Sequence, residues 1–300
     1  MDKKPYIALF ISVVSVSFAA IFIVSVSENV SPLSISFYRL LFTFLLISPA
    51  VFFVKKYREE ILGLSRSTFF IMLGIGVILA FHFALWITSL DYTSVASSVI
   101  LVTAHPALVA PVAHYFFKEK LSIVNVIGIS VSLIGVAILV LGNYGLGSLT
   151  LDSLEGNILA ILGGAAAGLY ILGGRKVRRS VSVVSYAFVV YGVGTVVLFF
   201  VCLFFGVSLY NLNLVDYEII FMMAVVSGVF GHTFYNWSLG HVRASVASVV
   251  LLGEPLGSTV LALMLPWIQQ VPSYYTAVGG SIILLGVYLT SRNTKNLLHT

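Results

Sequence analysis

The stretch Ser245-Val-Ala-Ser-Val-Val-Leu-Leu-Gly-Glu-Pro-Leu-Gly257 lies within a long apolar run whose one charged residue is Glu254. A charge at the centre of a bilayer is costly, about 2.5–3.5 kcal/mol for Asp, Lys or Arg even on a lenient insertion scale. Pro255 follows and removes a backbone donor, which weakens or kinks a helix. Gly253 and Gly257 flank the pair at a spacing that lets another helix come close. The stretch predicts a functional centre inside a membrane span; the alternative is a packing kink around a satisfied acid.

The composition is that of a membrane protein. Of 300 residues, 59% are hydrophobic and 9% are charged, whereas soluble domains carry about 25% charged residues. The mean hydropathy is +1.07. The single cysteine, Cys202, cannot form an internal disulfide, and no Cys/His spacing indicates a metal site or a cofactor. The net charge of +5 reflects membrane orientation, as argued below, so we expect no nucleic-acid partner.

Ten apolar segments are long enough to span a bilayer, which takes about 17–25 residues. They cover roughly residues 6–26, 34–54, 68–90, 94–117, 122–141, 158–174, 183–205, 219–239, 245–266 and 273–290. The first segment is long for a signal-peptide core and lacks a clear cleavage site, so we read it as a span. The links are short, so we expect an all-α polytopic membrane protein of ten transmembrane helices with no soluble domain.

The distribution of charges predicts the orientation. If the N-terminus is cytoplasmic, all of the 16 Lys and Arg residues except Arg39 fall on the cytoplasmic side, together with the C-terminus. The outer loops receive acidic residues and no Lys or Arg. This distribution follows the positive-inside rule. One missed or false span would scramble the pattern, so it supports the number of spans independently.

The chain contains an internal repeat, which is sought before any motif. A shift of 151 residues, from Phe83 to Phe234, also places Trp86 on Trp237 and Ser94-Val-Ala-Ser97 on Ser245-Val-Ala-Ser248. The register continues without a gap through four later pairs: Gly128 with Gly279, Ser130 with Ser281, Leu133 with Leu284, and Gly135 with Gly286. Matched Trp, Ser and Gly residues in one register are much less expected by chance than matched Leu and Val.

Each half has five spans, and because five is odd the second half enters the membrane from the opposite side. We therefore divide the chain into a first repeat at 1–141, an outer linker at 142–157 and a second repeat at 158–300. In transporters with inverted repeats, the substrate site lies near the midplane, where helices interrupted by Gly or Pro line it. Spans four and nine are interrupted here, at Pro106 and Pro111 and at Pro255.

Polar residues within the spans are the candidate substrate-binding residues, because intramembrane ionisable groups face the bundle interior and mark functional sites. This set comprises Arg39, His82, His105, His232, Asn236 and Glu254, with Trp86, Tyr38, Tyr170 and Tyr191 as aromatic walls. Other interpretations remain open. Arg39 is long enough to snorkel to outer headgroups, each histidine could be a neutral contact between helices, and Tyr170 could fill a packing gap.

These features resemble the drug/metabolite transporter superfamily, in particular the EamA-type exporters. The resemblance covers almost the whole chain and rests on Ile35-Ser-Phe-Tyr-Arg-Leu-Leu41, Pro106, Phe117-Lys-Glu-Lys-Leu121, Gly128 to Gly135 and Gly253-Glu-Pro255. It implies a central cavity lined by spans one, three, four, six, eight and nine. It also implies export of amino acids or other metabolites; as the alternative, relatives move sugars, nucleotide sugars or drugs. The chain departs from the pattern at Trp267-Ile-Gln-Gln270, where the repeat mate carries Lys118-Glu-Lys120.

The sequence therefore predicts a secondary transporter in the cell membrane that moves a small solute, as a monomer or a homodimer. It lacks a Gly-x-x-x-x-Gly-Lys-Ser/Thr run, so we expect no direct use of ATP. Coupling to a proton gradient through Glu254 and gradient-free exit are both open. An intramembrane enzyme using Glu254 and His105 lacks any nucleophile or metal motif, and a passive channel lacks a filter-like ring of carbonyls or charges.

Overall fold

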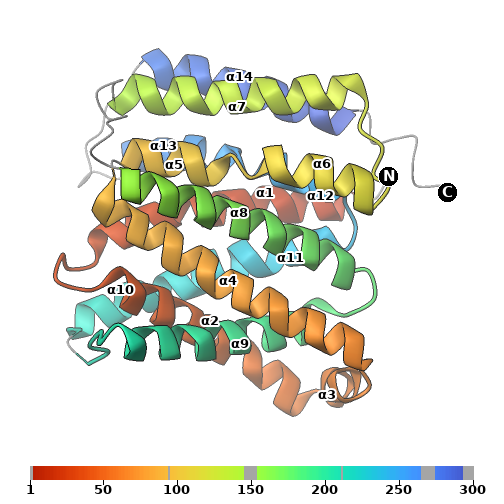
Figure 1. The fold of residues 1–300 in the computed structure, drawn as a ribbon, viewed down its shortest axis with the longest axis vertical. Helices are drawn as coiled ribbons and strands as arrows, with labels where there is room; N and C mark the ends of the chain where they lie inside the picture. Colours follow the sequence, from red (N-terminus) through yellow and green to blue (C-terminus); the bar gives the residue numbers. More distant parts are fainter. Residues whose placement is uncertain (1–2, 94, 145–153, 211, 265–273, 293–300) are drawn as a thin grey trace.

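The computed structural model describes residues 3–93, 95–144, 154–210, 212–264 and 274–292, and these residues form helices and no strands. Most of the predicted outer linker, 145–153, and the strip Trp267–Gln270 lie outside the described residues. The helices run roughly parallel and antiparallel in stacked layers (Figure 1).

The first repeat contains the five expected spans and one additional helix. Its helices are α1 (Lys4–Ser25), α2 (Pro32–Phe53), α3 (Lys55–Leu62), α4 (Arg66–Tyr92), α5 (Val95–Thr103), α6 (Pro106–Phe116) and α7 (Ile123–Tyr144). The short amphipathic α3 is the additional helix; it buries none of its residues. The N-termini of α2 and α4 are capped because the side chains of Ser31 and Ser65 accept bonds from Leu33 N and Thr68 N, as serine often does at such positions.

The second repeat has the same order of spans. Its helices are α8 (Leu154–Val177), α9 (Val183–Phe204), α10 (Leu214–Met223), η3 (Ala224–Thr233), α11 (Phe234–Leu239), α12 (Ala244–Val250), α13 (Gly253–Met264) and α14 (Tyr274–Arg292). Six segments of the described chain are long and apolar enough to cross a membrane, and four shorter apolar helices occupy the other four predicted spans. The prediction of an all-α protein with ten membrane spans is confirmed.

Spans four and nine are broken where proline predicts it. The first break separates α5 from α6 just before Pro106, and the second separates α12 from α13 at Leu251 and Leu252, before Pro255. Proline cannot donate to the preceding turn, so the helix ends or bends on its N-terminal side. In the repeat register the second break lies about one turn earlier than the first, so the halves agree in outline and differ in detail.

Spans of one repeat pack in pairs against spans of the other. α7 lies against α14, α2 against α9, α4 against α8, and α1 against η3, and Figure 1 shows α7 and α14 side by side at one edge. The α7–α14 contact is close because a Cβ atom on Gly135 would lie 2.7 Å from Ile283 N and 2.9 Å from Gly279 O. The glycines that the repeat aligns are therefore the points where the two backbones meet.

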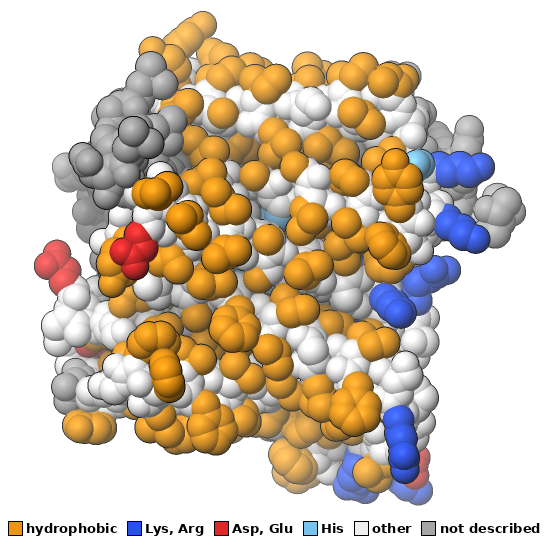
Figure 2. Space-filling view, viewed as in Figure 1, with side chains coloured by type: hydrophobic (Ala, Val, Ile, Leu, Met, Phe, Trp, Pro, Cys, Tyr) orange, Lys and Arg blue, Asp and Glu red, His pale blue; other side chains and the backbone are white. Residues whose placement is uncertain are grey.

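The charged side chains gather at the ends of the bundle. In the space-filling view, Lys and Arg lie at the end where α3 is found, and the long middle of the visible face is apolar (Figure 2). α1 begins and α14 ends at this same basic end (Figure 1). An apolar belt with one basic end is what a bilayer and the positive-inside rule require.

Candidate functional site

Glu254 lies at the start of α13, directly after the break in span nine. Its side chain is half-buried. α1 holds this segment closely: Ser17 Oγ donates to Glu254 O at 3.3 Å, and Ser258 Oγ donates to Ser17 O at 2.8 Å. A Cβ on Gly257 would lie 2.1 Å from Ser17 Oγ. The predicted glycine pair therefore does bring another helix close, and that helix is α1.

Arg39 is the positive counterpart of Glu254. Its side chain is 2% exposed, and its guanidinium carbon lies 4.4 Å above the centre of the Phe83 ring on α4. Arg39 does not snorkel to the headgroups, because a cation stacked on an interior aromatic ring faces the bundle. Its Nη1 atom is buried without a hydrogen-bond partner in the described chain.

Arg39 and Glu254 interact electrostatically, yet they do not form an ion pair. The ion pairs among the described residues are Lys55–Glu59 and Arg175–Glu119. An arginine and a glutamate thus both lie within the membrane region without an ion pair between them. Such an arrangement is costly unless another polar group completes it.

His82 and Trp86 form a second part of the site. They lie one turn apart on α4 and stack with ring centres 5.9 Å apart and planes 9° apart. His82 Nδ1 lies 2.9 Å from the carbonyl oxygen of Gly163 on α8. Because a carbonyl only accepts, Nδ1 carries the proton, and in the neutral ring Nε2 is left as an acceptor. Trp86 is half-buried, and its Nε1 donor has no partner in the described chain.

His105 occupies the break in span four. It is 8% exposed and is the last residue before α6. Its Nδ1 atom is buried with no hydrogen-bond partner among the described residues, while it interacts electrostatically with His82. The interruption of the helix therefore places an unsatisfied polar group in the interior, much as the break in span nine places Glu254 there.

Asn236 connects three helices through its amide. Its Nδ2 donates to the hydroxyl of Tyr170 on α8 and, at 3.1 Å, to that of Tyr191 on α9. Tyr191 also shares a hydrogen bond of 3.3 Å with Thr233. The Oδ1 atom of Asn236 has no partner in the described chain, although the residue is fully buried. Tyr170 is thus part of a polar network, which argues against an apolar packing role.

His232 joins the two parts of the site. Its ring meets Phe83 edge-on, with centres 5.3 Å apart, and lies 6.3 Å from the ring of Tyr170. Phe83 also carries Arg39 on its face. A continuous set of contacts therefore connects seven of the candidate residues: Arg39, His82, Trp86, Tyr170, Tyr191, His232 and Asn236.

Tyr38 lies apart from this group. Its hydroxyl donates to the carbonyl of Leu209, in the link after α9, and accepts from Tyr217 at 3.3 Å. Its ring packs on Phe37, Phe42 and Tyr217. The neighbouring Arg39 projects from another face of α2, because residues adjacent in a helix point in different directions.

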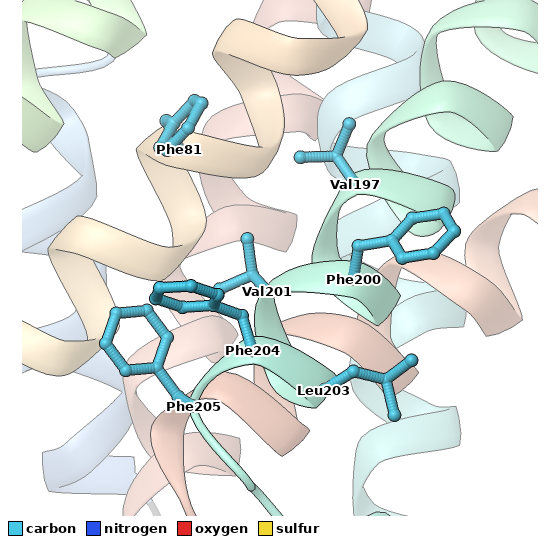
Figure 3. A pocket seen from close by; sticks show the side chains of 7 residues that line it. All are labelled: Phe81, Val197, Phe200, Val201, Leu203, Phe204 and Phe205. Carbon is cyan, nitrogen blue, oxygen red and sulfur yellow. The ribbon is translucent and has the colours of Figure 1, made fainter.

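A groove of about 750 Å³ opens on the surface between α4 and α9 (Figure 3). Its lining is entirely apolar and consists of Phe81, Val197, Phe200, Val201, Leu203, Phe204 and Phe205. Phe204 and Phe205 are highly exposed. A surface hollow of this composition suits lipid chains, and it contains none of the candidate residues.

Two residues of the site were not among the candidates. Phe83 was noted only as a repeat pair, yet it bridges Arg39 and His232. Thr233 bonds to Tyr191. Neither carries a charge, so the rule that selects intramembrane ionisable groups misses them. Their sequence signal is position alone: each follows a candidate histidine directly.

The site can bind a polar solute through opposite charges and unpaired hydrogen-bonding atoms among aromatic rings. Its unpaired atoms include Arg39 Nη1, Trp86 Nε1, His105 Nδ1 and Asn236 Oδ1. Within the described chain, no group of three or more His, Cys, Asp or Glu residues could hold a metal ion. The arrangement thus fits recognition of a small solute with both acidic and basic groups.

The chain is similar to known proteins in both sequence and fold. The family model of EamA-like transporters matches residues 3–141 and 154–292. A protein of Archaeoglobus fulgidus described as an uncharacterized transporter is 24% identical over 97% of this chain and 98% of its own. The uncharacterized transporter YyaM of Bacillus subtilis is 27% identical over 74% of this chain and 72% of its own. One crystal structure of a protein aligns with a TM-score of 0.79 over 99% of this chain and 100% of that one, at 17% identity, which concerns the fold alone.

Proposed function

The chain belongs to the EamA-like transporter family, and from that premise we propose that it is a secondary transporter of a small metabolite. Its substrate is an amino acid or a similar small solute, exported across the cell membrane by alternating access. The observation that carries the proposal is the unpaired couple of Arg39 and Glu254 inside the bundle. A solute with a carboxylate and an ammonium group would neutralise both charges at once.

The surroundings of the two charges support a zwitterion of modest size. An arginine binds a carboxylate through two parallel hydrogen bonds, and Arg39 has an unpaired Nη1 atom. Glu254 is half-buried and forms no ion pair among the described residues, so its carboxylate is available to accept hydrogen bonds from an ammonium group. The stacked pair His82 and Trp86 offers a flat wall for the side chain of the solute.

The orientation in the membrane follows from the charge pattern. Lys and Arg gather at one end of the bundle, which by the positive-inside rule is the cytoplasmic end, so both termini are cytoplasmic. Glu254 is the proposed proton carrier if a proton gradient drives export; gradient-free exit uses the same site. The transporter works as a monomer or a homodimer.

The test is flux in proteoliposomes with a panel of amino acids, nucleosides, sugars and drugs, with and without a pH gradient. Competition should then use phenylalanine, its amide and 3-phenylpropionate. The amide lacks the carboxylate and the propionate lacks the ammonium group, so we expect only phenylalanine or another complete amino acid to compete well. Incorporation of folded protein is checked for every preparation.

Each outcome discriminates between functions. Saturable flux of nucleosides, sugars or drugs alone would overturn the amino-acid assignment and keep the transporter. Single-channel conductance would indicate a channel, and chemical turnover of a solute would indicate an enzyme. Competition by the amide and the propionate as strong as that by phenylalanine would remove the charge couple from substrate recognition.

A further inference from the structure

Glu119 is a buried carboxylate at the basic end of the bundle, outside the candidate site. It lies in the link between α6 and α7, and its side chain is 7% exposed. Its Oε1 atom accepts from Arg175 Nε at 3.2 Å and from Ala244 N at 3.2 Å. Its Oε2 atom accepts from the hydroxyl and the backbone N–H of Ser245 at 3.4 and 3.5 Å. One side chain therefore ties the end of span four to the end of span six and the start of span nine.

Two arginines extend this network. Arg175 Nη1 donates to the carbonyl of Leu239 at the end of α11, at 2.9 Å. Arg243 Nη1 donates to the carbonyl of Lys120, in the same link as Glu119, at 3.4 Å. The basic ends of spans four, six, eight and nine are thus joined around a single carboxylate.

The link itself is shaped to present Glu119. Lys118 adopts a left-handed conformation with φ of 54°, which costs energy for any residue other than glycine. The next backbone N–H, that of Glu119, donates to Ala113 O at 3.1 Å, and Leu121 N donates to His114 Nδ1 at 3.2 Å. The turn folds back on α6, so movement of that helix moves the carboxylate.

All the partners of the Glu119 carboxylate belong to the second repeat, whereas Glu119 belongs to the first. In inverted-repeat transporters, alternating access moves one repeat or bundle against the other, so bonds between repeats at one end must break for that end to open. Arg175–Glu119 is the one ion pair between the repeats among the described residues; the other pair lies within α3. The Glu119 carboxylate is thus located where opening has to occur.

The residues that the repeat register places opposite this network carry no charge. In the repeat register, Glu119 corresponds to Gln270, Arg175 to Val24 and Arg243 to Tyr92. A neutral amide and two uncharged residues cannot form an ion pair. The ion pair at the basic end therefore has no counterpart in the repeat, although at the other end Asp216 of the second repeat accepts from the backbone N–H and the hydroxyl of Ser27 of the first, at 3.0 and 2.8 Å.

We propose that Glu119 holds an inner gate closed. We define the inner gate as Glu119, Arg175, Arg243 and the start of α12. The gate keeps the cytoplasmic end closed at rest, and Glu119 releases Arg175 and Ser245 when the site opens to that side. This inference rests on the proposed transport function. Glu119 is a positioning residue, since it sets the conformation and does not contact the site.

The test measures distance across the gate, without substrate, in nanodiscs. Spin labels are attached to Cys residues at the exposed Lys120 and Lys176, in a Cys202→Ala background, and their separation is read by pulsed EPR. Glu119→Gln should add a longer-distance population and raise the open-to-closed ratio at least about tenfold, because removing one partner of a buried pair is strongly destabilising. Arg175→Gln should do the same from the other side of the pair.

The matched control is Glu59→Gln. It removes the same charge from the Lys55–Glu59 ion pair, which lies at the same end and is exposed, with side chains 77% and 59% accessible. It should leave the distances unchanged. Unchanged distances in folded Glu119→Gln and Arg175→Gln would overturn the gate. Failure of both variants to fold would also overturn it, because the pair would then be required for folding. Because the measurement needs no substrate, a wild-type protein that transports nothing from the panel would contradict the proposed function and leave the gate assignment intact.

Discussion

At the scale of single residues, the main cost in this protein is the burial of polar groups that lack partners. Arg39 Nη1, His105 Nδ1 and Asn236 Oδ1 are buried without hydrogen bonds in the described chain. Each such group costs about 1–3 kcal/mol when it is left unsatisfied. A protein retains several of them in one place when a ligand or water satisfies them part of the time, so the group points to a binding site rather than to a stable core.

The Glu254→Gln variant should lose transport and keep its fold. The substitution preserves the size of the side chain and removes a charge that makes no ion pair among the described residues. We expect substrate affinity to fall about tenfold or more, since a hydrogen bond to a charged group is worth about 1.5–3 kcal/mol. Binding is measured on purified protein and compared with thermal unfolding in detergent. Loss of folded protein together with activity would make Glu254 a structural residue.

Glu60 gives a prediction of pH dependence outside the membrane spans. Its carboxylate accepts from Ser182 N at 2.9 Å, from the Ser182 hydroxyl and from Ser185 Oγ at 2.5 Å, and so caps α9. Partial burial alone would raise the pKa of Glu60, but these hydrogen bonds outweigh it and hold the pKa below its usual value. A lowered pKa in the folded state means that the cap stabilises the protein above the unfolded pKa, about 4.3, and is lost as the pH falls through the folded value.

The Glu60→Gln variant should therefore be less stable than the wild type at neutral pH. The gap should shrink as the pH falls from about 4.3, where the carboxyl group of the unfolded chain becomes protonated, through the lower pKa of the folded state, where the cap itself loses its charge. The difference in stability is measured by thermal unfolding in detergent from about pH 3 to about pH 8, which includes the range in which carboxylates titrate. The Glu59→Gln variant, on the same helix, is the control. A gap that stays constant over the whole range would show that the charge of Glu60 does not contribute.

The sequence singled out the ionisable candidate residues because a charge in an apolar span is conspicuous. It could not show that Arg39 faces Phe83, since the face that a residue presents depends on helix rotation, which is set by packing. It assigned Tyr38 to the same group because tyrosine near a binding site and tyrosine at a membrane interface have the same local sequence. The hydrogen bonds of Glu119 were hidden for a similar reason: an acid between two lysines resembles any cytoplasmic loop.

At the scale of elements, span eight differs from its repeat mate. Residues Ala224–Thr233 form a π-helix, whereas α4 is an unbroken α-helix over the corresponding residues. π-helical segments are rare and often occur at functional sites, and this one ends at His232 and Thr233. No residue type marks a π-helix as proline marks a break, so the two broken spans could be predicted and this segment could not.

Gly228 in the π-helix should be intolerant of alanine. A Cβ there would lie 2.2 Å from Thr43 Oγ1 on α2, and overpacking of this kind costs typically about 1–3 kcal/mol. We expect Gly228→Ala to lower the unfolding temperature in detergent and Thr43→Ala to restore part of the loss in the double variant. Gly74→Ala on α4 is the control, because a Cβ there meets nothing within 4 Å; it should be neutral or stabilising. Equal effects of the two glycine substitutions would contradict the close contact of α2 and η3.

At the scale of the whole molecule, the inverted repeat accounts for the architecture. The largest contacts between spans join one repeat to the other, as in α7 with α14 and α2 with α9, so one set of sequence patterns specifies both halves. The halves diverge in three features: a single Glu254, a π-helix in one of two corresponding spans, and the ionic network around Glu119. Hydropathy and the repeat predict the shared part, because they depend on patterns that both halves retain, while the differences depend on individual contacts.

The charge pattern makes a testable statement about the molecule in its membrane. If all Lys and Arg except Arg39 lie inside, a reporter that is active only outside should be inactive at Lys120, Arg179 and the C-terminus and active within residues 142–157. Alkaline phosphatase fusions measure this, and fluorescent-protein fusions at the same positions should give the opposite pattern. Five spans per half require the C-terminus to return to the side of the N-terminus. An active fusion at the C-terminus together with inactive fusions at Lys120 and Arg179 would mean that an odd number of spans follows Arg179, which would contradict the inverted repeat.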